Sequence, residues 1–242
     1  MGHLGELRRR ITYIAIVVVI CMIVAFIEKK WVFFVLLRPL KDTQVHQLTT
    51  LGVTEAFMNV LKVSIYAGLI ISLPFIIYQF WAFIMPALYE NEKRSTVPYV
   101  LSTTALFLAG VAFGYFIVLP VGLRFMIGYG GDLFNQLLQA ERYINFVSMF
   151  LLAFGLVFLL PLVMMLLSWA GIVNHQKMKK VRKYAILVEA IVAMVFTPSQ
   201  DPVSMALMLI PLILLYEFGI WLARLAQKRK DKRDQLAVVS ES

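Results

Sequence analysis

Six long apolar runs dominate the chain and restrict it to folds that place helices in a lipid bilayer. They cover Ile11–Ile27, Phe57–Met85, Val97–Leu119, Ile144–Ala170, Tyr184–Phe196 and Val203–Leu222. A helix needs about 20 residues to cross a hydrocarbon core of ~30 Å. The chain is 61% hydrophobic and 15% charged, against roughly 45–50% and 25% in soluble domains. The sequence therefore predicts an all-α membrane protein with six transmembrane helices.

Two of the runs have unusual lengths. The first run can extend through Trp31–Leu37, beyond the charged break Glu28-Lys29-Lys30. The fifth run would span only ~20 Å at about 1.5 Å per residue. It is therefore expected to be sunk within a bundle or to sit in locally thinned bilayer.

The basic residues predict the orientation. With the N-terminus inside, sixteen Lys and Arg lie on the inner side and six on the outer side, leaving out Lys62 within the second run. Lys62 is near one end of that run, from which its side chain can extend toward the membrane surface. The positive-inside rule then places both termini in the cytoplasm. Residues 1–222 are predicted to form the six-helix domain and residues 223–242 a polar, disordered cytoplasmic tail.

The net charge of +9 does not indicate a nucleic-acid partner, because most charges lie at the ends of apolar runs. The single cysteine, Cys21, excludes an intrachain disulfide.

An acidic cluster follows the second apolar run. Glu90 and Glu92 come directly after Pro86, where Lys and Arg are usual on a cytoplasmic side. One interpretation is a site for a cationic partner. The other is that Glu92 only neutralises its neighbours Lys93 and Arg94.

Several ordered segments together resemble one family over nearly the whole chain. They are His3-Leu4-Gly5-Glu6-Leu7-Arg8-Arg9-Arg10; Tyr78-Gln79-Phe80-Trp81-Ala82-Phe83 with Pro86-Ala87-Leu88-Tyr89 and Glu92-Lys93-Arg94; Phe113-Gly114-Tyr115-Phe116 with Pro120; and Thr197-Pro198, Asp201, Ser204, Ile210-Pro211 and Leu215-Tyr216-Glu217. The set resembles the TatC family, the multispanning receptor subunit of the twin-arginine protein translocase.

The resemblance implies six helices in a curved, concave bundle in the cytoplasmic (inner) membrane of a prokaryote. It implies binding of twin-arginine signal peptides of folded preproteins at the cytoplasmic face. The implied partners are single-span Tat subunits of the TatA and TatB type, further copies of the chain and the lipid bilayer. The proton-motive force drives transport, and the resemblance implies no enzymatic activity, cofactor or metal.

The resemblance also assigns residues to signal-peptide binding. Acids at the positions of Glu6 and Glu92 contact the two arginines of the peptide, which fits the planar, bidentate bonds between guanidinium and carboxylate. The alternative for Glu6 is that it caps a helix or pairs with Arg9 or Arg10. Arg8 matches a functionally sensitive position, although alone it is an ordinary topogenic charge. Phe83 packs on the apolar part of the peptide or anchors the helix at the interface.

Other matched residues are interpreted as structural. Pro39 and Pro86 match family prolines, whereas Pro161 and Pro211 lie inside predicted spans and bend them. The bends either fit helices around one another or shape a concavity for another helix. Asp201 either caps the sixth helix, the favoured interpretation, or contacts a partner. Glu217, near the inner end of the sixth helix, is expected to pair with a tail cation such as Arg224.

The fourth span departs from the family pattern, because Leu159 stands where an acid is expected. Glu189 lies inside the fifth run, where a carboxylate costs ~2.5–3.5 kcal/mol on insertion scales. We therefore expect Glu189 to supply the missing acid and, when protonated, to bind a polar residue of a partner's span. The alternative is that Glu189 faces the inner interface.

Two other classes of function fit less well. Secondary transporters show paired repeats and several midplane polar groups, whereas only Glu189 is clearly deep. Intramembrane enzymes need catalytic or metal motifs, and none stands out.

Overall fold

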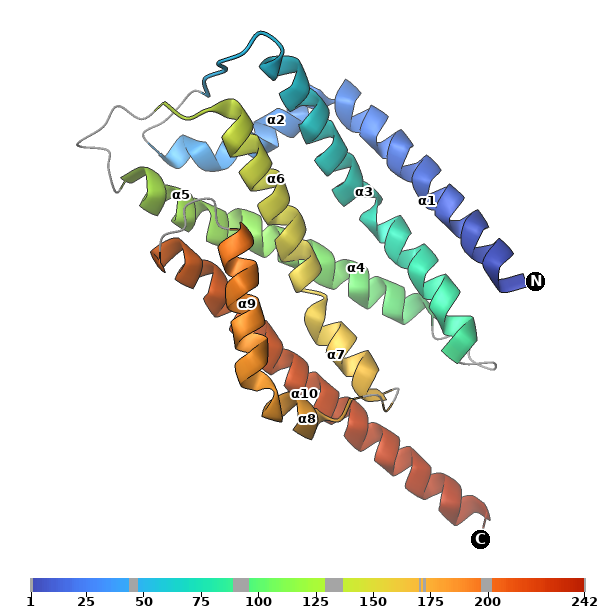
Figure 1. Ribbon diagram of the computed structural model, residues 1–242. Helices are drawn as coiled ribbons and strands as arrows, with labels where there is room; N and C mark the ends of the chain where they lie inside the picture. The colour runs from blue at the N-terminus through green and yellow to red at the C-terminus, as the bar shows by residue number, and fades with distance from the viewer. Residues whose placement is uncertain are drawn as a thin grey trace. The chain divides into compact units, whose positions relative to one another are not determined.

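The computed structural model describes residues 2–43, 48–88, 96–128, 137–169, 171, 173–196 and 202–241. In this part of the chain every long element is a helix (Figure 1). The elements are α1 (Gly2–Ile27), α2 (Lys29–Leu37), η1 (Arg38–Asp42), α3 (Glu55–Leu88), α4 (Thr96–Phe113), η3 (Gly114–Val118), α5 (Leu119–Gly128), α6 (Ala140–Val157), α7 (Leu160–Trp169), α8 (His175–Lys180), α9 (Arg182–Phe196) and α10 (Pro202–Glu241).

Five helical stretches in the described residues are long and apolar enough to cross a membrane. They are Gly5–Ile27, Glu55–Phe83, Tyr99–Gly128, Ala140–Ser168 and Met208–Leu225. The remaining predicted span, the fifth, corresponds to α9, whose 15 residues make it short, as its apolar run indicated. The all-helical membrane character is confirmed, and the count of six remains a prediction.

The chain divides into two compact units, residues 1–155 and 156–242, and the single six-helix domain over 1–222 stays a prediction. In unit 1, α1 runs alongside α3, and α2 turns away from α1 (Figure 1). The turn is at Glu28, so Trp31–Leu37 belongs to a separate helix. At Gly68 an added Cβ would lie 2.6 Å from the Met22 backbone nitrogen, which shows how closely α1 and α3 approach. Small residues allow such approach between membrane helices.

The core of unit 1 is aromatic where α4, η3 and α6 meet. Phe107 is fully buried, Phe154 is 2% exposed, and the ring of Phe150 lies 4.6 Å from that of Phe154. Gly155 lies directly against Phe107, because an added Cβ would overlap that ring. These contacts fix α4 against α6.

At the other end of unit 1, polar contacts join the segment around Thr49 and the start of α3 to the start of α6; we call this set of contacts the polar clamp. Thr49 pairs with the start of α6 through two backbone hydrogen bonds of 2.9 Å, one from its amide to the Leu138 carbonyl and one from the Ala140 amide to its carbonyl. The Glu55 carboxylate accepts the amides of Leu51 (2.6 Å) and Gly52 (3.1 Å). Lys62 donates to Glu141 at 2.5 Å. Lys62 thus has a carboxylate partner within unit 1.

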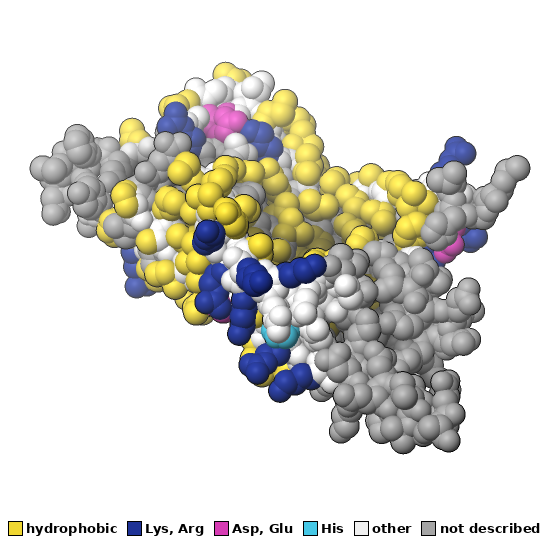
Figure 2. Space-filling view, turned by 60° about the horizontal axis from the view of Figure 1, so that its bottom comes forward, with side chains coloured by type: hydrophobic (Ala, Val, Ile, Leu, Met, Phe, Trp, Pro, Cys, Tyr) yellow, Lys and Arg dark blue, Asp and Glu magenta, His cyan; other side chains and the backbone are white. Residues whose placement is uncertain are grey.

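In unit 2, α7 packs along α10, which also contacts α8 and α9. Its core contains Met164, Met178, Ile220 and Ala223. Figure 2 shows one face of the molecule, on which Lys and Arg side chains gather beside a histidine. Helix α8, which begins at His175, carries Lys177, Lys179 and Lys180.

Proline acts differently at two predicted bends. Pro161 is the second residue of α7, after a turn at residues 158–159, where its missing amide costs no hydrogen bond. Pro211 lies inside the continuous helix α10.

The backbone of residues 223–241 continues α10 as a helix, and the disordered cytoplasmic tail stays a prediction. The physical reason for the helix is the content of Ala, Leu, Gln, Lys and Arg, which are strong helix formers.

Candidate functional site

A polar network joins the first turns of α1 to the last turns of α3. Arg10 donates to the same Glu6 carboxylate oxygen through Nε (3.0 Å) and Nη2 (2.6 Å). Its Nη1 donates to the Gln79 side-chain oxygen at 3.0 Å. The Glu6 side chain is 45% exposed and that of Arg10 22%. Glu6 therefore already holds a guanidinium at an accessible helix end.

The alternative in which Glu6 pairs with Arg10 is thus present in the structure. Arg9 donates to the Tyr13 hydroxyl at 2.9 Å, and Arg8 is exposed. Gln79 was missed as a site residue by the sequence analysis. The sequence feature that could have indicated Gln79 is that it is a single amide side chain inside an apolar run, within the segment Tyr78–Phe83 that resembles the family.

A second contact fixes the end of α3 against α4. Trp81 is 4% exposed, and its indole nitrogen donates to the Thr103 hydroxyl at 2.9 Å. Its ring stacks on that of Tyr99 at 5.4 Å. The half-buried Phe83 follows Gln79 by four residues, so the two lie on the same side of α3.

Glu92 and Asp201 lie outside the described residues, as does the side chain of Pro86. The backbone of Pro86 is helical within α3, and Pro39 is the second residue of η1. The start of α1, the end of α3 and the start of α4 lie at the same end of unit 1 (Figure 1). The segment that carries Glu92 connects those two ends of α3 and α4.

Glu189 lies in the middle of α9 and is 5% exposed. Both its carboxylate oxygens are buried without a hydrogen-bond partner among the described residues. Whether Glu189 lies within the membrane or faces the inner interface stays a prediction. Leu159, which replaces the expected acid, lies in the turn before α7 and is partly buried.

Glu217 of α10 has a different partner from the one the sequence suggested. Arg182 donates to it through Nε (2.6 Å) and Nη2 (2.9 Å), whereas Arg224 had been expected. Arg224 lies seven residues further along the same helix, whereas Arg182 begins the neighbouring helix α9. The pair ties the start of α9 to α10 beside the buried Glu189.

Among the described residues, no group of three His, Cys, Asp or Glu side chains could hold a metal ion. The site therefore consists of charged and amide groups that suit recognition of cations through hydrogen bonds.

Comparisons with known proteins agree with this arrangement. The family model described as "Sec-independent protein translocase protein (TatC)" matches residues 2–211. The chain is 40% identical to the Sec-independent protein translocase protein TatC of Desulforapulum autotrophicum, over 97% of this chain and 87% of that protein. It is 41% identical to the TatC protein of Aquifex aeolicus, over 94% and 95% of the two chains.

Solved structures agree as well. A crystal structure of the twin-arginine translocase receptor TatC matches with a TM-score of 0.82 at 38% identity, covering 93% of this chain and 99% of that one. A second crystal structure of that receptor, in DDM, matches with a TM-score of 0.84 at 39% identity, covering 92% and 99%. The family is a transport component of the membrane rather than an enzyme, and the chain, a multi-pass membrane protein, belongs to the TatC family of Sec-independent protein translocase proteins.

Proposed function

We propose that the chain is the receptor subunit of a twin-arginine translocase and binds twin-arginine signal peptides of folded preproteins. The observation that carries this proposal is the exposed Glu6 carboxylate, which binds a guanidinium at the end of α1. Charge-assisted bonds to carboxylate favour Arg over Lys, because guanidinium presents a planar fork.

Glu92 is the second acid of the proposed site. Its segment connects α3 to α4, and both helices are fixed near that end, α3 to α1 by Arg10 and Gln79 and α4 to α3 by Trp81. The signal peptide's arginines would bind Glu6 and Glu92 and displace Arg10 from Glu6. Arg8, which is exposed two residues after Glu6, would contribute to the same site, and Phe83 would contact the apolar part of the peptide.

The charge distribution supports a cytoplasmic location for this site and for both termini, in the inner membrane of a prokaryote. Sixteen Lys and Arg lie on the inner side of the proposed six spans and six on the outer side. Signal peptides reach the membrane from the cytoplasm, so the site and its ligand would share one compartment.

Crosslinking to a peptide that carries a photoreactive residue next to its two arginines tests the proposal. Glu6→Ala and Glu92→Ala should each lower crosslinking at least about tenfold, because hydrogen bonds to charged groups contribute roughly 1.5–3 kcal/mol. The matched control is Glu90→Ala, which removes an acid of the same segment and should crosslink normally.

A peptide with Lys-Lys in place of Arg-Arg should crosslink weakly to the unmodified protein. A Glu6→Ala, Glu92→Ala double variant that crosslinks as well as the unmodified protein would refute the site.

We further propose that Glu189 contacts the membrane span of a TatA- or TatB-type subunit, within an assembly that holds further copies of this chain and is driven by the proton-motive force. Its unpaired, buried carboxylate supports this role, because such a group needs a hydrogen-bond partner in lipid. Asp201, just before α10, would cap that helix or contact the same partner.

Photocrosslinkers placed along α9 would locate the partner's span. Glu189→Leu should abolish crosslinking and transport, whereas Glu189→Gln, which keeps a hydrogen-bonding group, should retain part of both. Normal transport by Glu189→Leu would exclude this role.

A further inference from the structure

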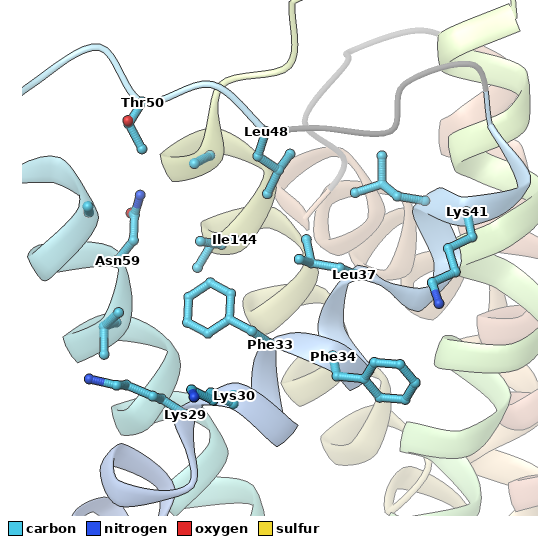
Figure 3. A pocket seen from close by; sticks show the side chains of 14 residues that line it. Lys29, Lys30, Phe33, Phe34, Leu37, Lys41, Leu48, Thr50, Asn59 and Ile144 are labelled. Atoms are coloured by element: carbon cyan, nitrogen blue, oxygen red, sulfur yellow. The ribbon is translucent and has the colours of Figure 1, made fainter.

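Unit 1 contains a cavity of about 740 Å³ that the proposed signal-peptide site does not use. It lies between α2, η1, α3 and the start of α6, at the end of unit 1 where α1 meets α2 (Figure 3). Ligand sites in proteins commonly measure about 300–1,000 Å³. The cavity is therefore large enough for part of a lipid.

The position of α2, which forms one wall, is fixed by two tyrosines. The hydroxyl of Tyr115 donates to the carbonyl of Val35 at 2.6 Å, and that of Tyr143 to the carbonyl of Leu36 at 2.8 Å. The Val35 carbonyl also accepts the Arg38 amide, so the two tyrosines add side-chain bonds to carbonyls of the last turn of α2 and hold the wall. The cavity is thus part of the tertiary structure.

The lining of the cavity is mainly apolar, with one buried amide. The Phe33 ring and Ile144 face the cavity (Figure 3). Asn59 also lines it, is 3% exposed, and has no hydrogen-bond partner for either side-chain polar atom among the described residues. A buried amide without a partner costs about 1–3 kcal/mol. A ligand with both hydrogen-bond acceptors and donors would satisfy it.

The edges of the cavity are basic. Lys29 and Lys30 lie at one edge and Lys41 at the opposite one (Figure 3). None of the three forms a salt bridge within the described part of the chain. Lys29 and Lys41 are each held near an aromatic ring, at 5.4 Å from Phe26 and 4.9 Å from Phe34. An anionic group between these edges would meet three positive charges.

The depth of these groups in the membrane selects the ligand. Lys29 and Lys30 follow the end of the apolar stretch Gly5–Ile27 after Glu28 alone, at the boundary of the hydrocarbon. Asn59 lies four residues into α3, about 6 Å along the helix. In a phospholipid the phosphate lies at this boundary, the glycerol oxygens lie slightly deeper, and the acyl chains lie in the hydrocarbon. The lysines, Asn59 and the apolar lining of the cavity would match these three parts in turn.

We propose that this cavity binds an anionic phospholipid. The phosphate lies at the edge formed by Lys29 and Lys30, and Lys41 at the opposite edge adds to the positive potential of the cavity. The glycerol or ester oxygens bond to the Asn59 amide, and an acyl chain lies on Phe33 and Ile144. The site is independent of signal-peptide recognition, since it shares no residue with the network of Glu6, Arg10 and Gln79.

The test uses the full chain in lipid nanodiscs of phosphatidylcholine that contain a small fraction of photoactivatable phosphatidylglycerol, with labelled peptides mapped by mass spectrometry. Phosphatidylglycerol should label α2 and the start of α6, and a phosphatidylcholine analogue with the same photoreactive chain should label them at least about tenfold less. Each basic residue near an anionic lipid contributes roughly fivefold in binding. Equal labelling by the two lipids would overturn the proposal.

Two variants separate binding from folding. Removing the three lysines together (Lys29→Gln, Lys30→Gln, Lys41→Gln) should lower labelling at least about tenfold, whereas the charge-matched control at α8 (Lys177→Gln, Lys179→Gln, Lys180→Gln) should leave it unchanged. Asn59→Leu should lower labelling about two- to tenfold without loss of thermal stability, because it removes an unpaired buried amide.

Unchanged labelling in both site variants would refute the lipid site. Loss of labelling on addition of inorganic phosphate at matched ionic strength would instead identify a site for a free anion, which also overturns the lipid assignment.

Discussion

Replacing Gly68 by Ala should separate α1 from α3. The added Cβ would lie 2.6 Å from the backbone nitrogen and 2.7 Å from the Cα of Met22, whereas ordinary contact begins near 3.4 Å. The helices must therefore move apart by about 0.8 Å, because the obstructing atoms belong to the backbone rather than to a flexible side chain.

The cost can be isolated with a matched glycine. An added Cβ at Gly122, in α5, meets no atom within 4 Å. Both substitutions gain the same helix propensity, about 1 kcal/mol for Gly to Ala. The difference between the two variants thus reports the steric term alone, about 1–3 kcal/mol for overpacking.

The assay is the free energy of unfolding in detergent, measured for both variants and the unmodified protein. We expect Gly68→Ala to be about 1–3 kcal/mol less stable than Gly122→Ala. The displacement of α1 should also weaken crosslinking to the twin-arginine peptide in Gly68→Ala, because Glu6 moves with that helix. Equal stability of the two variants, within about 0.5 kcal/mol, would refute the close packing of α1 on α3.

Two further predictions follow from polar contacts in unit 1. Glu55→Ala should increase hydrogen exchange of the Leu51 and Gly52 amides by about tenfold or more, because each loses a bond to a charged acceptor; unchanged exchange would exclude the clamp. Trp81→Phe and Thr103→Val should each destabilise the protein by at least about 0.5–1.5 kcal/mol in denaturant titrations. The double variant should lose less than the sum, since both changes remove the same indole–hydroxyl bond, and Thr103→Val also removes the bond from that hydroxyl to the Tyr99 carbonyl. Strict additivity would show that the indole–hydroxyl bond contributes nothing.

The all-helical membrane fold and the family could be predicted because both follow from local patterns. Apolar length sets each span, and the ordered motifs carry the family resemblance. The short fifth span could also be predicted, and it corresponds to α9. The roles of Glu6, Glu92 and Glu189 stay predictions, and their tests are those given above.

Contacts between distant parts of the chain could not be predicted. Arg224 was expected to pair with Glu217 because it lies nearby on the same helix, yet Arg182 of α9 does so. Lys62 was expected to extend toward the membrane surface, yet it pairs with Glu141. In each case several partners were possible along the sequence, and helix packing selected one.

The sequence by itself determined which segments enter the membrane, because the transfer of apolar side chains and the need to satisfy backbone hydrogen bonds act within each segment. The tertiary structure alone decided which polar groups are paired and which are left without partners. Tyr115 and Tyr143 reach carbonyls 80 and 107 residues away in the sequence, and Asn59 lines a cavity whose walls come from several helices. Such contacts depend on the distances and angles between helices, which hydropathy does not encode.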